Sequence, residues 1–237
     1  MNKELLVILG PTATGKTDLA LKLANKFNGE IIAADSRQVY KGLDIGTGKL
    51  PNQNVKVKKQ NNKWEIDGVK IWMYDVVSLE TQYSVADYVK DADNVIKDIL
   101  RRKKLPIIVG GTGFYVKALT EGLSNLAMSV DLKLRKDLEE LSLEELQKKI
   151  QILSPTRWEN LNNSDKKNPR RLLRSIELVS TNPYVVKSQN WDVLKIGLTA
   201  PREVLYKNSD LRVLSWFKQG IIEEVRNFNE SGIPLKR

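Results

Sequence analysis

The stretch from Leu5 to Thr17 constrains the fold of this chain more than any other. Leu5–Leu9 is an unbroken apolar run, which predicts a strand buried on both faces. Gly10–Thr17 then matches the phosphate-loop pattern G-x-x-x-x-G-K-[ST] at every fixed position. Apolar residues at helical spacing follow and predict a helix over Asp18–Phe27. A strand, a phosphate loop and a helix in this order predict an α/β protein that binds a polyphosphate group.

Each residue type in the loop has a physical role. Gly10 and Gly15 allow the backbone to curl so that its N–H groups point at a phosphate, and the helix N-terminus adds partial positive charge. Lys16 is expected to bridge phosphate oxygens, and the hydroxyl of Thr17 to ligate Mg²⁺. The alternative is a chance match in a glycine-containing turn, which the flanking strand and helix disfavour. The loop alone leaves open which polyphosphate binds, and whether a phosphate is transferred or leaves.

Residue composition restricts the chemistry that is available. The 237 residues contain no cysteine, which excludes disulfides, thiolate nucleophiles and cysteine-ligated zinc. They contain no histidine either, so a general base must be a carboxylate, lysine or tyrosine, and a bound metal must be a hard ion on oxygen ligands. No apolar run reaches the length of a membrane span and no signal-peptide pattern begins the chain, so we expect a cytoplasmic protein. The net charge of +10 favours a polyanionic partner, but a drift toward lysine-rich composition explains it equally well.

The rest of the sequence predicts a core in which strands and helices alternate. The further predicted strands are Ile31–Asp35, Val69–Val77, Pro106–Val109 and Val193–Leu198. A capping box at Ser84–Asp87 opens a helix before the Pro106 strand. This alternation favours a P-loop NTPase-like parallel sheet flanked by helices, doubly wound with right-handed crossovers.

Two other segments have distinctive patterns. Residues 52–64 are rich in lysine and asparagine and predict an exposed excursion, and the following Asp67-Gly68 pair indicates a hairpin. From Glu203 toward Phe228, apolar residues at helical spacing predict a last amphipathic helix, with a break expected at Gly220.

A mostly helical segment interrupts the core. A second capping box, Ser142–Glu145, opens one of its helices, and another helix is predicted over Pro169–Ser180. We therefore expect a P-loop α/β core formed by residues 1–122 and 190–237, with residues 123–189 as a helical insertion.

Two candidate site segments follow strand ends. The carboxyl ends of parallel strands meet at the ligand crevice of an open sheet, so Asp35 is expected near the phosphate loop. In a chain without histidine it is a candidate general base, and the alternatives are a strand-end cap or a magnesium ligand. Gly110-Gly111-Thr112 follows another strand at the same edge, and a plain strand-to-helix turn is its alternative.

Taken in order, these motifs resemble those of the tRNA dimethylallyltransferases, which attach a five-carbon isoprenoid to N6 of an adenosine beside the anticodon. The resemblance covers nearly the whole chain. The motifs that carry it are Gly10–Thr17, Asp35–Tyr40, Lys41–Lys49, Tyr83–Asp87, Gly110–Tyr115, Pro169–Arg174 and Gly220–Val225. It implies transfer of a dimethylallyl group from dimethylallyl diphosphate to tRNA with release of diphosphate, in a monomeric enzyme whose insertion binds tRNA.

The resemblance also assigns roles to residues. Asp35 matches the base that takes a proton from the attacking adenosine amine, while Lys16, Thr17 and Mg²⁺ stabilise charge as diphosphate leaves. The expected diphosphate ligands are Gly10, Thr12, Ala13, Thr14, Gly15, Lys16, Thr17 and Arg202. The expected tRNA contacts are Asp35, Ser36, Arg37, Gln38, Thr112, Arg170, Arg171, Leu172, Leu173 and Arg174. The three arginines of the last group share a helix face, for which a solvated surface is the alternative.

The chain departs from the family pattern in three places. Family members usually continue past a position like Ile233, whereas this sequence ends at Arg237. They commonly carry a histidine pair where Ile71–Tyr74 stands, and an arginine where Asn208 stands.

Other functions stay open at this level. A P-loop kinase of a nucleoside or small metabolite would use the same Lys16, Thr17 and an aspartate, but the Asp35–Lys49 stretch disfavours it. Prenyl transfer to a free adenine nucleotide is a second alternative, and Asp44–Thr47 looks more like the tRNA type. A relative that binds RNA without reacting is a third, and the intact phosphate loop and Asp35 disfavour it.

Overall fold

The structure is a computed structural model that describes residues 4–50, 55–60, 62–122, 132–180 and 191–232. The chain divides into two compact units. The first consists of Met1–Glu121 together with Ser188–Arg237, and the second of Gly122–Lys187. Each unit has its own hydrophobic core.

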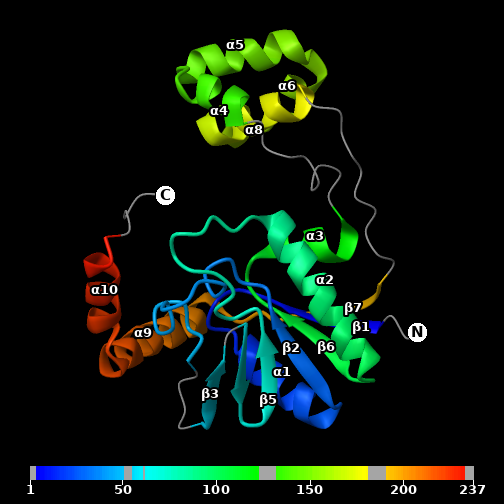
Figure 1. Cartoon of the computed structure of the whole chain (residues 1–237), viewed down its shortest axis with the longest axis vertical. Coiled ribbons are helices and arrows are strands. Elements are labelled where there is room, and N and C mark those ends of the chain that lie inside the picture. The colour runs from blue at the N-terminus through cyan, green and yellow to red at the C-terminus, as the bar shows by residue number, and fades with distance from the viewer. Residues whose placement is uncertain (1–3, 51–54, 61, 123–131, 181–190, 233–237) are drawn as a thin grey trace. The chain divides into compact units, whose positions relative to one another are not determined.

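The first unit is built on a sheet whose central part is parallel (Figure 1). Its parallel strands lie in the order β5-β2-β6-β1-β7. Strand β1, which precedes the phosphate loop, therefore lies between β6 and β7. Their bounds are β1 Glu4–Leu9, β2 Gly29–Ala33, β5 Val69–Trp72, β6 Leu105–Val109 and β7 Asp192–Gly197. Strands β1, β2 and β6 are almost fully buried, as their continuous apolar runs require. The predicted P-loop NTPase-like sheet is confirmed.

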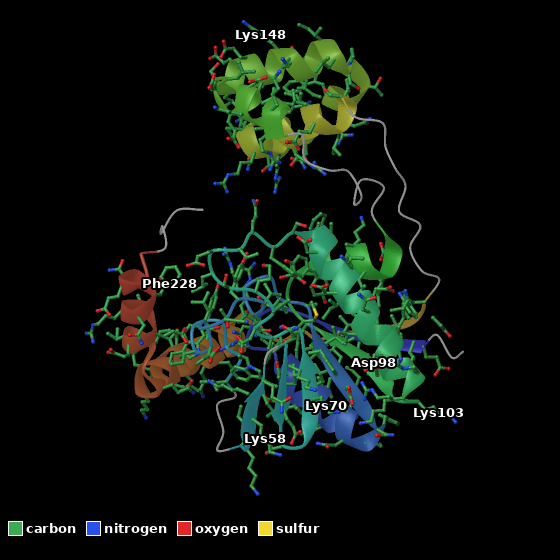
Figure 2. All side chains as sticks on the ribbon, viewed as in Figure 1. Lys58, Lys70, Asp98, Lys103, Lys148 and Phe228 are labelled. Atoms are coloured by element: carbon green, nitrogen blue, oxygen red, sulfur yellow. The ribbon has the colours of Figure 1, made fainter. Side chains whose placement is uncertain are left out.

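An antiparallel extension lies beyond β5. Strands β3 (Val57–Gln60) and β4 (Lys63–Ile66) pair with each other, and β4 pairs with β5 across the predicted Asp67-Gly68 turn. The lysine-rich segment is therefore part of the sheet. On β4 the side chains alternate, so Trp64 is 1% exposed in the core, while Lys58 on β3 is exposed (Figure 2).

Helices flank this sheet and connect its strands (Figure 1). The predicted capping box opens α2, because the Ser84 and Asp87 side chains each accept a hydrogen bond from the other's backbone N–H. Gly220, with φ of 96°, separates α9 from α10 at the predicted break. The helices of the first unit are α1 Lys16–Lys26, α2 Val85–Arg101, α3 Gly113–Glu121, α9 Arg202–Gln219 and α10 Ile221–Glu230.

The apolar residues of α9 and α10 recur at helical spacing, as the sequence indicates, but most of their side chains are exposed. Within the described residues, neither α9 nor α10 has a buried side chain. The reason is that no described element covers their outer face. The exposed apolar side chains there include Leu211, Leu214, Phe217, Ile222 and Val225.

The second unit is a cluster of helices (green to yellow in Figure 1). A capping box between Ser142 and Glu145 opens α5, as predicted. The helices are α4 Leu132–Glu139, α5 Leu143–Leu153, α6 Pro155–Asn160, α7 Asn163–Lys166 and α8 Pro169–Ser180. Their core is formed by Leu138, Leu146, Ile150, Leu172, Leu173 and Ile176. Every helix in the described part of the chain is too short or too polar to span a bilayer.

Candidate active site

The phosphate loop joins β1 to α1 at the carboxyl edge of the sheet. The Thr14 hydroxyl donates to the carbonyl of Pro11 (2.8 Å), which tightens the turn. Helix α1 starts at Lys16 directly after Gly15, and no side chain hydrogen bond caps its first turn. The N–H groups of that turn therefore face the loop without an acceptor from a capping side chain, as an anion site requires.

Lys16 points back across its own loop. Its Nζ donates to the carbonyl oxygen of Pro11 at 2.6 Å. Burial lowers the pKa of Lys16, and the nearby positive charge of Arg212 lowers it further, while the negative charge of Asp35 acts in the opposite direction. An anion placed among these groups would relieve the repulsion between Lys16 and Arg212.

Two pockets surround Lys16. The loop pocket, about 390 Å³, is lined by Ala13–Asp18 of the phosphate loop together with Gly48, Asn208 and Arg212. The carboxylate pocket, about 320 Å³, is lined by Thr12, Asp35, Arg37, Gln38 and Trp216, among others. Four residues line both pockets: Lys16, Thr17, Gly48 and Arg212. A phosphate group near Lys16 and a second substrate beside Asp35 would therefore be neighbours.

Asp35 lies two residues beyond β2 in a turn that is held from both sides. The backbone N–H of Arg37 donates to Asp35 Oδ1 (2.9 Å), and the N–H of Ser36 donates to Thr112 Oγ1 (3.1 Å). Thr112 in turn donates its N–H to the carbonyl of Ala34 (3.1 Å). At Gly110 a Cβ would collide with the backbone of Ala34, so glycine is required there. The Gly110–Thr112 segment, which connects β6 to α3, thus holds the residues on either side of Asp35.

Opposite the phosphate loop stands the wall loop, Asp44–Lys49. The Gln38 side chain donates to the carbonyl of Thr47 (3.0 Å). The Lys49 side chain is fully buried and bonds Asp75 (2.6 Å), Asp44 (3.1 Å) and a backbone carbonyl. Burial would raise the pKa of Asp44, but hydrogen bonds and charge from Lys59 and Lys49 outweigh it and lower that pKa.

Helix α9 contributes three polar or aromatic side chains to the pockets, and the sequence patterns had singled out only Asn208, as a departure from the family. Asn208, Arg212 and Trp216 are spaced by four residues, so they share one face of the helix. The Asn208 amide donates to the carbonyl of Ala13 (3.1 Å), and the Arg212 guanidinium lies 5.3 Å from the centre of the Trp216 ring. The periodicity of this helix identified only its apolar residues. The four-residue spacing of Asn208, Arg212 and Trp216 was the signal that could have pointed to them.

Arg202 does not lie where a diphosphate ligand was expected. It is exposed in the first turn of α9 and lines neither pocket, whereas Arg212 lines both. The two arginines are ten residues apart on α9, which is nearly three helical turns, so their side chains leave the helix at well-separated points. We therefore replace Arg202 by Arg212 in the candidate diphosphate site.

The residues expected to contact tRNA on α8 fall into different environments. Leu172 and Leu173 are buried in the core of the second unit, so their side chains stabilise α8 and do not face a ligand. Arg171 pairs with Asp165, and Arg174 pairs with the buried Glu177 (2.9 Å). Arg170 is exposed, and no ion pair is found for it within the described residues.

The pockets offer oxygen ligands for a hard metal ion. No group of three or more acidic side chains that could hold a metal occurs in the described parts of the chain. Thr17 and Asp35 do line the carboxylate pocket together. This sparse set suits Mg²⁺, which is typically held by few protein oxygens and completed by phosphate and water.

A phosphate loop between β1 and α1, at the carboxyl edge of a parallel sheet, makes this a P-loop protein of the α/β class. The comparisons with known proteins then identify the family. Residues 38–236 match the family model for IPP transferases, and residues 3–68 match that for isopentenyl transferases. The chain belongs to the IPP transferase family.

Curated relatives and solved structures agree with this assignment. The tRNA dimethylallyltransferase of Bacillus mycoides is 36% identical over 98% of this chain and 72% of its own length, and that of Leuconostoc mesenteroides is 35% identical over 98% and 74%. A solved tRNA isopentenylpyrophosphate transferase from Bacillus halodurans matches with a TM-score of 0.65 at 32% identity, over 99% of this chain and 72% of the other. A solved eukaryotic dimethylallyltransferase acting on tRNA matches with a TM-score of 0.80 at 27% identity, over 97% and 56%.

Proposed function

We propose that this chain transfers a dimethylallyl group from dimethylallyl diphosphate to N6 of an adenosine beside the anticodon of tRNA. The observation that carries the proposal is the shared lining of the two pockets by Lys16, Thr17 and Arg212, with Asp35 in the second pocket. A leaving diphosphate and an attacking amine need this adjacency, because the bond to one breaks as the bond to the other forms.

In the proposed reaction, N6 attacks the first carbon of the dimethylallyl group. The carbon–oxygen bond to diphosphate breaks, and the diphosphate takes the bonding electron pair. Asp35 accepts the proton that N6 loses. Lys16, Arg212 and the N–H groups of the first turn of α1 stabilise the charge that develops on the diphosphate.

We propose Mg²⁺ as the cofactor, held by the Thr17 hydroxyl and by phosphate oxygens of the donor. When bound, it would neutralise charge on the diphosphate. Chelation with EDTA should abolish transfer, and added Mg²⁺ should restore it. Full activity in excess EDTA would contradict this assignment.

We further propose that tRNA is the acceptor, as it is for the tRNA dimethylallyltransferases to which the chain is similar, and that the chain acts as a monomer. The decisive experiment incubates the protein with dimethylallyl diphosphate and unmodified tRNA, and separately with AMP as acceptor or with ATP and a nucleoside. We expect the tRNA to be prenylated. Light scattering of the protein should give the mass of a single chain. Prenylated AMP, or a phosphorylated nucleoside without prenylated tRNA, would replace the proposal by one of its alternatives.

A further inference from the structure

Glu224, on α10, is bound by the backbone of the wall loop. Its Oε2 accepts the N–H groups of Asp44 (2.8 Å) and Ile45 (2.7 Å), and its Oε1 accepts the N–H of Gly46 (2.9 Å). These bonds join segments that are 178 to 180 residues apart in the sequence. Hydrogen bonds to an ionised carboxylate are shorter and stronger than neutral ones, so a single side chain secures three successive backbone donors.

Helix α10 is directed at the wall loop by the break at Gly220. Ile221, Glu224 and Phe228 follow at spacings of three and four residues and share one face of α10. A Cβ at Gly46 would lie 3.1 Å from Cδ1 of Ile221, so this face lies directly against the loop. Phe228 lines a pocket with Lys41 and Gly42, just before the loop in the sequence (Figure 2 labels Phe228 on α10).

Residues of the wall loop also line the two pockets around Lys16. Gly46, Thr47 and Gly48 line the carboxylate pocket, and Gly48 and Lys49 line the loop pocket. A Cβ at Gly48 would collide with the Arg212 guanidinium, so the loop backbone and this arginine are in close approach. The position of the Asp44–Gly46 backbone therefore sets the shape of both pockets and the place available to Arg212.

We propose that Glu224 is a positioning residue for prenyl transfer. By holding the N–H groups of Asp44, Ile45 and Gly46, it keeps the wall loop in the conformation that closes the donor site against Arg212. This inference rests on the proposed function for its kinetic part, and it adds a residue that lines neither the loop pocket nor the carboxylate pocket. A carboxylate that only anchors α10 would affect stability and leave substrate affinity unchanged.

The test compares Glu224→Gln with Glu223→Gln. Glu223 is the neighbouring residue on the same helix, and it forms an exposed pair with Arg226 (2.5 Å) and no bond to the loop. In Glu224→Gln one of the two carboxylate oxygens is replaced by an NH₂ group. This group is a donor and cannot accept a backbone N–H, so at least one of the three bonds is lost. We expect amide hydrogen exchange at residues 44–46 to accelerate about tenfold or more, because a lost bond to a charged group has that size. The KM for dimethylallyl diphosphate should rise about tenfold, with kcat less affected.

Two measurements do not depend on turnover. Hydrogen exchange reports the loop directly, and calorimetric titration with inorganic diphosphate should show a Kd raised about tenfold in Glu224→Gln and unchanged in Glu223→Gln. If the wild-type protein prenylates no acceptor, the proposed function fails. These two measurements still test whether Glu224 holds the wall loop in place. Unchanged exchange at residues 44–46, or unchanged KM and diphosphate Kd, would overturn the role of Glu224. Should the glutamine variant not fold, Glu224→Asp, which keeps the charge but withdraws it by one methylene, is measured in its place with the same expected outcomes.

Discussion

At the scale of single residues, the site depends on charges whose positions the backbone defines. Asp35, the proposed base, is held in place, because its Oδ1 accepts the Arg37 N–H and it lines the pocket beside Lys16. Asp35→Asn keeps an oxygen for that hydrogen bond and removes the proton acceptor. We expect kcat to fall by about 10²- to 10⁴-fold, with the Kd for inorganic diphosphate little changed. Single-turnover transfer measured beside diphosphate titration checks this, and turnover near the wild-type rate would remove Asp35 as the base.

Arg212 and Arg202 form a matched pair for the diphosphate site, because both lie on α9 and only Arg212 lines the pockets. Replacing Arg212 with alanine should raise the Kd for inorganic diphosphate by about ten- to a hundredfold, since a charge-assisted contact is lost. Arg202→Ala should bind diphosphate as the wild type does. Calorimetry on both variants decides between them, and the opposite ranking would restore Arg202 as the ligand.

At the scale of elements, a buried carboxylate ties β2 to its neighbours. Glu30 is 1% exposed and accepts hydrogen bonds from Arg102 (2.5 and 2.7 Å), Lys104 (3.0 Å) and the Trp72 indole (2.8 Å). Burial acts to raise the pKa of Glu30, but the bonds from Arg102, Trp72 and Lys104 outweigh it and lower the pKa to about 2. The ion cluster therefore fastens the end of α2 and the start of β6 to the sheet.

This cluster predicts a pH-dependent stability. A carboxyl with a lowered pKa in the folded state stabilises the protein above its unfolded pKa, which is 4.5 for Glu30, and loses that effect as the pH falls toward about 2. Glu30→Gln should lower the free energy of unfolding by about 2 to 4 kcal/mol at pH 7, because cationic partners stay behind without their acceptor. Urea denaturation at several pH values checks this. The difference from wild type should shrink between pH 4.5 and 2, and a constant difference would show that packing alone is responsible.

The exposed pair between Glu121 and Lys195 (2.6 Å) provides the control for this series. The side chains are 42% (Lys195) and 49% (Glu121) exposed, and an ion pair that water reaches to this extent contributes little. Glu121→Gln should therefore leave the urea midpoint close to that of the wild type at every pH. A loss as large as that of Glu30→Gln would mean that charge count, rather than burial of the cluster, sets the stability.

At the scale of the whole molecule, Arg170 is exposed on the second unit, and we expect it to contact a tRNA phosphate. Its neighbours Arg171 and Arg174 are engaged with Asp165 and Glu177, so the three arginines of α8 are not equivalent. Arg170→Ala should reduce the slope of log K against log salt for tRNA by about 0.7 to 0.9, because one phosphate contact releases that many counterions. Filter binding across a salt series measures the slope. Lys148→Ala, on the exposed face of α5 (Figure 2), is the control and should leave it unchanged. Equal slopes for Arg170→Ala and wild type would mean that Arg170 is a solvated surface residue that makes no contact with tRNA.

Much of this molecule follows from local sequence. The phosphate loop, the buried strands and both capping boxes depend on residues within a few positions of one another, so their patterns predict them. The strand-end position of Asp35 also follows, because parallel strands deliver their carboxyl ends to one edge. The lysine-rich segment was harder to predict, since its pairing with β5 depends on the burial of Trp64 beside Tyr74 and Asp75.

By itself the sequence determined that this is a P-loop α/β protein with a polyphosphate site and a carboxylate close to it. Only the tertiary structure decided which arginine approaches that site, which α8 residues face outward, and that Glu224 clamps the wall loop. The physical reason is distance along the chain. Gly48 meets Arg212 and Asp44 meets Glu224 only after β7 has paired with β1 and carried α9 and α10 back to the loop edge. No short-range pattern encodes such contacts, because the two partners of each contact lie far apart in the sequence, one in a loop and the other on a helix.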